Sequence, residues 1–354
     1  MNLSNVIHGM WAITGGTLEE IQNIYAMHLR GEIANIPAIE AKIGKPLANN
    51  NRTIMSVQAG VAVIEIQGVI AQKMNLMNDI SGGTSSQMVS AAFSQAVNDP
   101  NIKGIIFNVD SPGGTVAGTF ELANEVYQAR GSKPLVAFTD GMIASAAYAI
   151  ASACDSIYIS GDTNPIGSIG VVSGHRDYSG AEAKQGVKTT EITAGAFKRV
   201  SSQYEPLSAD GRAEIQAKVD YLYAGFVDTV ARNRGTSKSR VLSSMADGRV
   251  FLGKQAIANG LVDGISTLPK IMADMNAPDA RNKMMKRRAT VAQVPAMTVQ
   301  PAISNAAFST ILAMKGVAPP RDAAAELAIT QAAEQTERAA AAEQIAKGGG
   351  VQWN

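Results

Sequence analysis

Ser145 lies where a serine could act as a nucleophile. It belongs to the stretch 140–148, DGMIASAAY, in which a strand is predicted to pass through a turn into a helix of small residues. The positive end of a helix dipole favours an alkoxide or oxyanion at the helix N-terminus. Small neighbours on both sides would also let a substrate backbone approach closely. A serine that caps a tightly packed alanine helix gives the same pattern, so this stretch alone leaves both roles open.

A turn that could hold an oxyanion follows the apolar stretch 102–110. Its sequence is Asp110-Ser111-Pro112-Gly113-Gly114. Two glycines after a proline permit a tight turn whose backbone N–H groups point into a cavity. Such donors stabilise the oxyanion of acyl transfer by about 2.7–4 kcal/mol each. A plain strand-to-helix turn is the alternative interpretation of this motif on its own.

A nucleophilic serine needs a base that removes its proton. Histidine is the usual base, and the chain contains three, His8, His28 and His175. A lysine can serve instead where burial lowers its pKa toward neutrality. Lys198 is the lysine that fits, because it follows a predicted strand at 189–194 and has small or apolar neighbours. We therefore expect Lys198 to be buried.

Alternating strands and helices must position these residues. Runs rich in β-branched residues predict strands, and the segments between them predict helices. The predicted strands are 61–70, 102–110, 134–140, 156–160 and 189–194, and the predicted helices are 85–98, 116–130, 145–153 and 208–233. This alternation indicates an α/β fold with a mainly parallel sheet and flanking helices.

Three zones are predicted along the chain. Residues 1–55 form a helical N-terminal preface, 56–270 form the α/β domain, and 271–354 form a flexible or helical tail of low complexity. Within the tail, 321–347 has strong helix propensity but few large apolar residues. A helix with so small an apolar face needs a partner to be stable.

Composition excludes several functional classes. The 31 basic and 30 acidic residues leave a formal net charge of +1, which argues against nucleic acid as a partner. The single cysteine, Cys154, permits neither an intrachain disulfide nor a Cys-based metal site. No stretch approaches the roughly 18 apolar residues of a membrane span, and the first residues lack the pattern of a signal peptide. We expect a soluble cytoplasmic protein that needs no metal or organic cofactor.

Four motifs occur in an order and spacing that resemble the signal peptide peptidase A (SppA) family of serine peptidases. They are SPGG at 111–114, ASAAY at 144–148, GSIGV at 167–171, and a G-x-x-K that ends at Lys198. The resemblance covers about 56–268, and it includes the closing segment GRVFLGKQAIANGLVDGI at 248–265. It implies a fold of the Clp protease–crotonase type and assembly into rings or other oligomers.

The resemblance also implies a role for each matching residue. Ser145 matches the nucleophile and Lys198 the general base, which together form a Ser–Lys dyad. Ser168 matches the serine that hydrogen-bonds and orients the lysine. Gly113 and Gly114 match the backbone of the oxyanion hole. No cofactor or metal enters such a mechanism.

Three further segments look like those of phage and prophage head-maturation proteases. They are WAIT…LEEI within 11–21, ISGGTS at 80–85 and YEPLS at 204–208. The likeness implies a protease that cuts scaffold and capsid-assembly proteins, and itself, within an assembling procapsid in the host cytoplasm. The helix at 321–347 would then contact scaffold or capsid protein.

Other functions fit parts of the sequence. His175 with Asp177 could replace Lys198 in a Ser–His–Asp triad. A crotonase-like acyl-CoA hydratase or hydrolase would share the fold, but that chemistry needs a carboxylate near the reacting carbon, whereas Ser145 is flanked by alanines. A general SppA-like peptide hydrolase and a catalytically silent assembly protein are the remaining alternatives.

Overall fold

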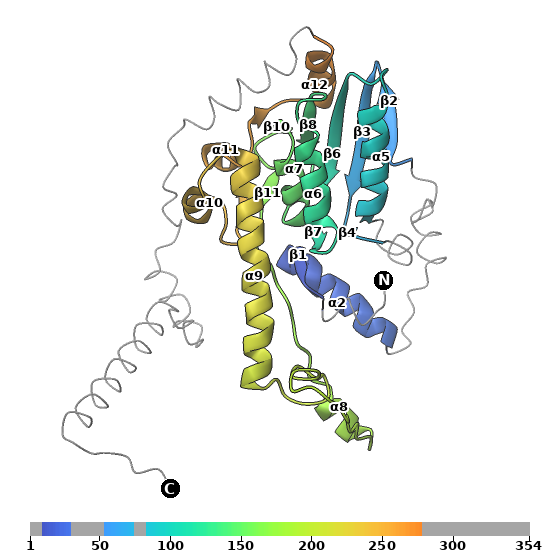
Figure 1. Cartoon of the computed structure of the whole chain (residues 1–354), viewed down its shortest axis with the longest axis vertical. Helices are drawn as coiled ribbons and strands as arrows, with labels where there is room; N and C mark the ends of the chain where they lie inside the picture. Colours follow the sequence, from blue (N-terminus) through green and yellow to red (C-terminus); the bar gives the residue numbers. More distant parts are fainter. Residues whose placement is uncertain (1–8, 30–52, 74–82, 278–354) are drawn as a thin grey trace, which may run out of the picture. The chain divides into compact units, whose positions relative to one another are not determined.

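A six-stranded sheet forms the centre of the molecule. The computed structural model describes residues 9–29, 53–73 and 83–277 (Figure 1). The strand order is β13-β10-β8-β6-β3-β2, and all neighbours are parallel except the edge strand β2. The strands are β2 (Met55–Gln58), β3 (Val61–Gln67), β6 (Gly104–Asp110), β8 (Leu135–Thr139), β10 (Ser156–Ile159) and β13 (Gly264–Ile265). The predicted α/β class with a mainly parallel sheet is confirmed.

Helices cover both faces of this sheet, because successive residues of a strand point to opposite sides. On one face, Val61 and Val63 pack with Ile271 and Met275 of α12 (Leu268–Met275). On the other face, Ala62 and its like-facing neighbours pack against four helices. These are α5 (Ser86–Asn98), α6 (Thr119–Gln128), α7 (Ala146–Ser152) and α9 (Ala209–Arg234).

Two small sheets continue the main strands beyond their carboxyl ends. One has the order β1-β7-β4-β5 and the other β12-β11-β9. Their strands are β1 (Trp11–Ile13), β4 (Ile70–Ala71), β5 (Thr84–Ser85), β7 (Gly113–Thr115), β9 (Ile143–Ala144), β11 (Pro165–Gly167) and β12 (Val250–Leu252). Strands β4, β7, β9 and β11 follow β3, β6, β8 and β10 in turn, so the small sheets lie at the edge where open α/β sheets bind ligands.

The N-terminal segment contributes a strand that the sequence did not predict. Helix α2 (Gly15–Leu29) confirms that the preface contains a helix, but it is preceded by β1, which pairs antiparallel with β7. Trp11 and Ile13 pack with Leu18 and Ile21 of α2 and with Val69. Residues 9–21 are therefore packed onto the α/β domain.

Helix α9 stands partly clear of the core. Residues from Phe226 onward contribute most of its buried side chains, and the Phe226 ring makes an edge-on contact with Phe120 of α6. The first half of α9 is largely exposed. We call residues 179–212, which comprise α8 (Ser179–Lys184), a connecting segment and the start of α9, the arm (Figure 1). The predicted strand at 189–194 is wrong: these arm residues are exposed and have no strand beside them, with Ile192 97% exposed.

A buried ion pair links the last part of the α/β domain to its core. After α10 (Lys238–Ser244) and α11 (Gly253–Ala258), Asp263 accepts two hydrogen bonds from Arg234, at 2.9 and 2.8 Å. Burial lowers the pKa of Arg234, but the Asp263 carboxylate together with nearby Tyr148 and Cys154 raises it, and the net shift of the pKa is upward. The pair joins the C-terminal end of α9 to the main sheet, because Asp263 also accepts from Ile157 N–H at 2.8 Å.

Some predictions concern residues beyond this description. The tail from 278, including the helix at 321–347, lies outside the described residues, and so do residues 1–8 and 30–52. The three-zone division stays a prediction. Among the helices that the structure describes, none combines the length and apolar character needed to cross a membrane.

Candidate active site

Ser145 occupies a strained turn between β9 and α7. Its φ of 55° and ψ of −117° lie outside the regions that most residues adopt. Holding a serine there costs about 1–3 kcal/mol. The residue is completely buried, and its Oγ has no hydrogen-bond partner in the described part of the chain. A sharp strand-to-helix turn of this kind presents the nucleophilic serine in α/β-hydrolases.

Gly113 lies directly against Ser145. A Cβ atom added to Gly113 would lie 2.9 Å from the Ser145 Cβ and would overlap the carbonyl oxygen of Ala12. The Gly113 φ of 105° also disfavours any side chain. Ser111 fixes this turn, since its hydroxyl accepts from Gly113 N–H at 3.2 Å and donates to Gly68 O at 2.6 Å. The structure thus brings the predicted oxyanion turn to the predicted nucleophile.

Two more backbone groups, those of Gly114 and Ala146, lie next to Gly113 and Ser145 in the chain. We call the region that these four residues form the active-site corner. Gly114 pairs with Ala12 of β1 on one side and with Ile70 of β4 on the other. Ala146 opens α7, and first-turn N–H groups have no acceptor within their helix. The N–H of the residue after the nucleophile lines the oxyanion hole of α/β-hydrolases. Ala146 is therefore a candidate donor that the motif analysis missed, although its position after Ser145 was the signal.

Ser168 lies beside Ser145 because their strands are neighbours. Strands β9 and β11 are parallel, with Ala144 opposite Gly167, and each serine is the next residue. Ser145 N–H donates to Gly167 O at 2.7 Å. Ser168 is buried and, like Ser145, has a positive φ, of 50°. The structure thus brings Ser168 next to Ser145, whereas its predicted role of orienting Lys198 stays a prediction.

Lys198 is not brought to this corner within one chain. It lies exposed on the arm, in a stretch without helix or strand, so the expectation of a buried lysine is wrong. Its side chain makes no hydrogen bond or ion pair with another described residue. The arm is held at the start of α9, where Ser208 Oγ donates to Val200 O at 3.2 Å. Because a helix rises about 1.5 Å per residue, that end of α9 is roughly 27 Å from Phe226.

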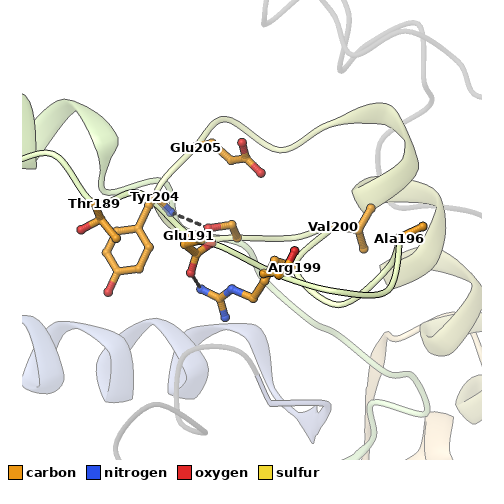
Figure 2. Close-up of a pocket in the computed structure, with 9 residues that line it drawn as sticks. Thr189, Glu191, Ala196, Arg199, Val200, Tyr204 and Glu205 are labelled. Carbon is orange, nitrogen blue, oxygen red and sulfur yellow. Dashed lines mark hydrogen bonds and ion pairs between the residues drawn. The ribbon is translucent and has the colours of Figure 1, made fainter.

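A hollow of about 310 Å³ lies on the arm near Lys198, but it is not the serine site. Figure 2 shows its lining, in which Arg199 forms an ion pair with Glu191. The hydrogen bond from Arg199 is the main cause that lowers the pKa of the Glu191 carboxyl. Neither Ser145 nor Ser168 lines this hollow.

His175, the alternative base, is bonded to the arm. Its Nε2 lies 2.7 Å from Ser202 O. Asp177 accepts from Ser179 N–H at 2.8 Å, and hydrogen bonds from Ser179 are the main cause that lowers the pKa of Asp177. The described structure therefore gives no hydrogen bond between Asp177 and His175, which a triad would need to orient the imidazole.

Cys154 does not offer a second nucleophile. It is completely buried at the end of α7, and burial raises the pKa of its thiol. The thiolate is the reactive form of cysteine. Among the described residues, no group of three or more His, Cys, Asp or Glu could hold a metal ion.

Comparisons with known proteins agree with this geometry. The family model described as Peptidase family S49 matches residues 128–281, which include Ser145, Ser168 and Lys198. The chain is 33% identical over 250 residues to "Head-tail preconnector protein GP5" of Enterobacteria phage P21. It is 31% identical over 257 residues to "Capsid assembly protease C" of Escherichia phage lambda. These alignments cover 70% and 72% of this chain but 48% and 58% of the relatives, so the chain spans about half of their length.

A third relative is covered more fully. The chain is 31% identical over 212 residues to "Putative protease slr0021" of Synechocystis sp., and the alignment covers 60% of this chain and 72% of that one. Among solved structures, a ClpP1 mutant from Listeria monocytogenes matches 59% of this chain and 92% of its own, with a TM-score of 0.38 and 16% identity. From the matched family and its well-covered relative, the chain belongs to peptidase family S49.

Proposed function

We propose that this chain is a serine endopeptidase that cuts scaffold and capsid-assembly proteins, and itself, during phage head maturation in the host cytoplasm. The observation that carries the catalytic part is the strained, buried Ser145, which lies against Gly113 and whose Oγ has no hydrogen-bond partner among the described residues. The names of the two phage relatives support the biological role. A general peptide hydrolase would have the same kind of site, but it would not explain the sequence similarity to two phage proteins.

Lys198 is the proposed base, and we assign it to a neighbouring copy of the chain. The lysine is exposed at the far end of α9, whereas Ser145 is buried at the N-terminus of α7. Exposed apolar side chains mark the arm and the free half of α9: Ile192 is 97% exposed, Phe197 64% and Tyr221 80%. Exposed apolar groups of this kind favour contact with another protein surface. A homo-oligomer would cover them and carry Lys198 to Ser145 of the next copy.

The proposed reaction uses the corner described above. Lys198 in its neutral form removes the proton of Ser145 as Oγ attacks a peptide carbonyl, and Ser168 orients the lysine. The N–H of Ala146 and N–H groups of Gly113 or Gly114, released from their partners Ser111 and Ala12 when substrate binds, stabilise the tetrahedral oxyanion. Lys198 then gives its proton to the leaving amine, and water hydrolyses the acyl-enzyme along the reverse route.

Intact mass spectrometry tests this function. Wild type, Ser145→Ala, Lys198→Ala and His175→Ala are each incubated with a candidate scaffold protein. We expect the wild type and His175→Ala to shorten the scaffold or themselves, while the other two variants stay intact. If Lys198→Ala still cuts while His175→Ala does not, the base is His175. If wild type and Ser145→Ala give identical masses on every candidate, the protease proposal fails and a silent assembly role replaces it.

A further inference from the structure

Strand β1 lies between two backbone segments of the active-site corner. On one side it pairs antiparallel with β7, which carries Gly113 and Gly114. On the other side Trp11 forms an antiparallel bridge with Val172, in which Trp11 N–H donates to Val172 O at 2.9 Å and Val172 N–H donates to Trp11 O at 2.8 Å. A short segment held on both sides by main-chain bonds is bound as peptides are bound by β-strand addition.

The register of β1 places Ala12 at the oxyanion turn. Thr14 N–H donates to Pro112 O at 3.0 Å, and Val116 N–H donates to Met10 O at 3.2 Å. Hydrogen-bonded pairs alternate along an antiparallel ladder. Since Ala12 is opposite Gly114 midway between those two bonds, Ala12 and Gly114 form the hydrogen-bonded pair.

The Ala12 carbonyl also lies near the nucleophile. The point where a Gly113 Cβ would stand is overlapped by the Ala12 carbonyl oxygen and lies 2.9 Å from the Ser145 Cβ. Ala12 is completely buried, and so is the unpartnered Ser145 Oγ. With β1 in place, no peptide can reach Ser145 along this edge of β7.

Side chains of β1 alternate between two environments. Trp11 and Ile13 pack in the cluster with Leu18 of α2, whereas Ala12 packs into the main core that also contains Ala146. The position opposite Gly114 thus holds a small side chain, and both its neighbours are large and apolar.

We propose that Met10–Thr14 is an intrinsic peptide ligand of the Ser145 cleft and that substrates must displace it. The cleft between β7 and Val172 takes an extended peptide with a small residue opposite Gly114 and apolar residues on either side of it. This inference rests on the proposed function, because it takes the cleft to be the substrate site. Its test does not depend on that function, because peptide binding is measured in a variant that cannot cut. An edge strand can pair with only one added strand at a time, so β1 and substrate compete.

Binding of a labelled peptide tests the proposal in a background that cannot cut. A fluorescein-labelled peptide of residues 9–16, GMWAITGG, is titrated by anisotropy against Ser145→Ala and Ser145→Ala/Ala12→Pro. Proline at position 12 removes an N–H from the β1 ladder and loosens the strand. If β1 fills the cleft at least nine-tenths of the time, its release tightens peptide binding about tenfold or more.

Matched controls separate this effect from a general one. Ser145→Ala/Gly15→Pro places the proline at the first position of α2, where it is tolerated, and it should bind the peptide as weakly as Ser145→Ala. Removal of residues 1–14 gives a second way to vacate the cleft if Ala12→Pro does not fold. Equal affinity in all variants, or no binding to either vacated form, overturns the proposal. A vacated form that binds the peptide while its Ser145-containing counterpart cuts nothing would refute the protease function alone.

Discussion

Gly113 is a position where one added methyl group should strongly impair catalysis. In Gly113→Ala the new Cβ would lie 2.9 Å from the Ser145 Cβ, closer than real Cβ contacts come, and would overlap the Ala12 carbonyl oxygen. Release of β1 removes the second contact but not the first. The φ of 105° adds backbone strain of about 1–3 kcal/mol. The turn must therefore shift relative to Ser145.

A shift of this turn removes or misaligns an oxyanion donor. Loss of one such donor costs about 2.7–4 kcal/mol in the transition state, which is a fall of about 10²–10³ in kcat. The assay is kcat/KM on a peptide with alanine at the cleaved position, with circular dichroism to show that the variant is folded. Gly161→Ala is the matched control, because a Cβ there meets nothing within 4 Å. If folded Gly113→Ala matches Gly161→Ala in kcat/KM, Gly113 does not line the reacting centre.

Three further predictions concern assembly, the core and the arm. If Lys198 acts in a neighbouring copy, mixing Ser145→Ala with Lys198→Ala should restore about a quarter of the wild-type sites; no recovery after joint refolding would place the dyad within one chain. Asp263→Asn should lower the free energy of unfolding by about 3–5 kcal/mol, because it leaves the buried Arg234 without its carboxylate; urea titration measures this, and Asp228→Asn, which breaks only an exposed pair with Lys238, should change little. Arg199→Met should raise the pKa of Glu191 toward its ordinary value, because it removes the hydrogen bond that lowers this pKa. In the wild type the ion pair is present above the lowered pKa and is lost as pH falls through it. A carbon NMR titration of Glu191 with the same midpoint in both proteins would contradict this.

The main sheet and most of the corner around Ser145 could be predicted from the sequence. Val61 to Ile64 in β3 and Ile105 to Phe107 in β6 are continuous apolar runs, which is the pattern of a strand buried on both faces. Ser145 and Gly113 meet because both follow such strands, and the carboxyl ends of parallel strands lie at one edge. The order of the motifs was therefore enough to place them together.

Three features could not be predicted, for different physical reasons. Strand β1 has only three residues, Trp11 to Ile13, which is too short for a period, and its stability comes from partners more than a hundred residues away in the sequence. The β-branched residues at 189–194 predicted a strand, but a strand needs a neighbour for its main-chain groups, and no sequence pattern supplies one. For Lys198, apolar neighbours in sequence indicated burial, yet burial is set by what packs on the residue in three dimensions, and in the described structure Lys198 is exposed.

The backbone of Ser145 has a consequence for evolution and engineering of this protein. The positive φ is unfavourable in the folded state, and so is the buried hydroxyl, which has no hydrogen-bond partner in the described part of the chain. Glycine at that position would relieve both. A screen that selects only for thermal resistance should therefore accumulate glycine at 145, and at 168 for the same backbone reason, and lose turnover as it succeeds. Serine at 145 thus stands at a position where the fold itself favours another residue, which is a trade-off between stability and activity.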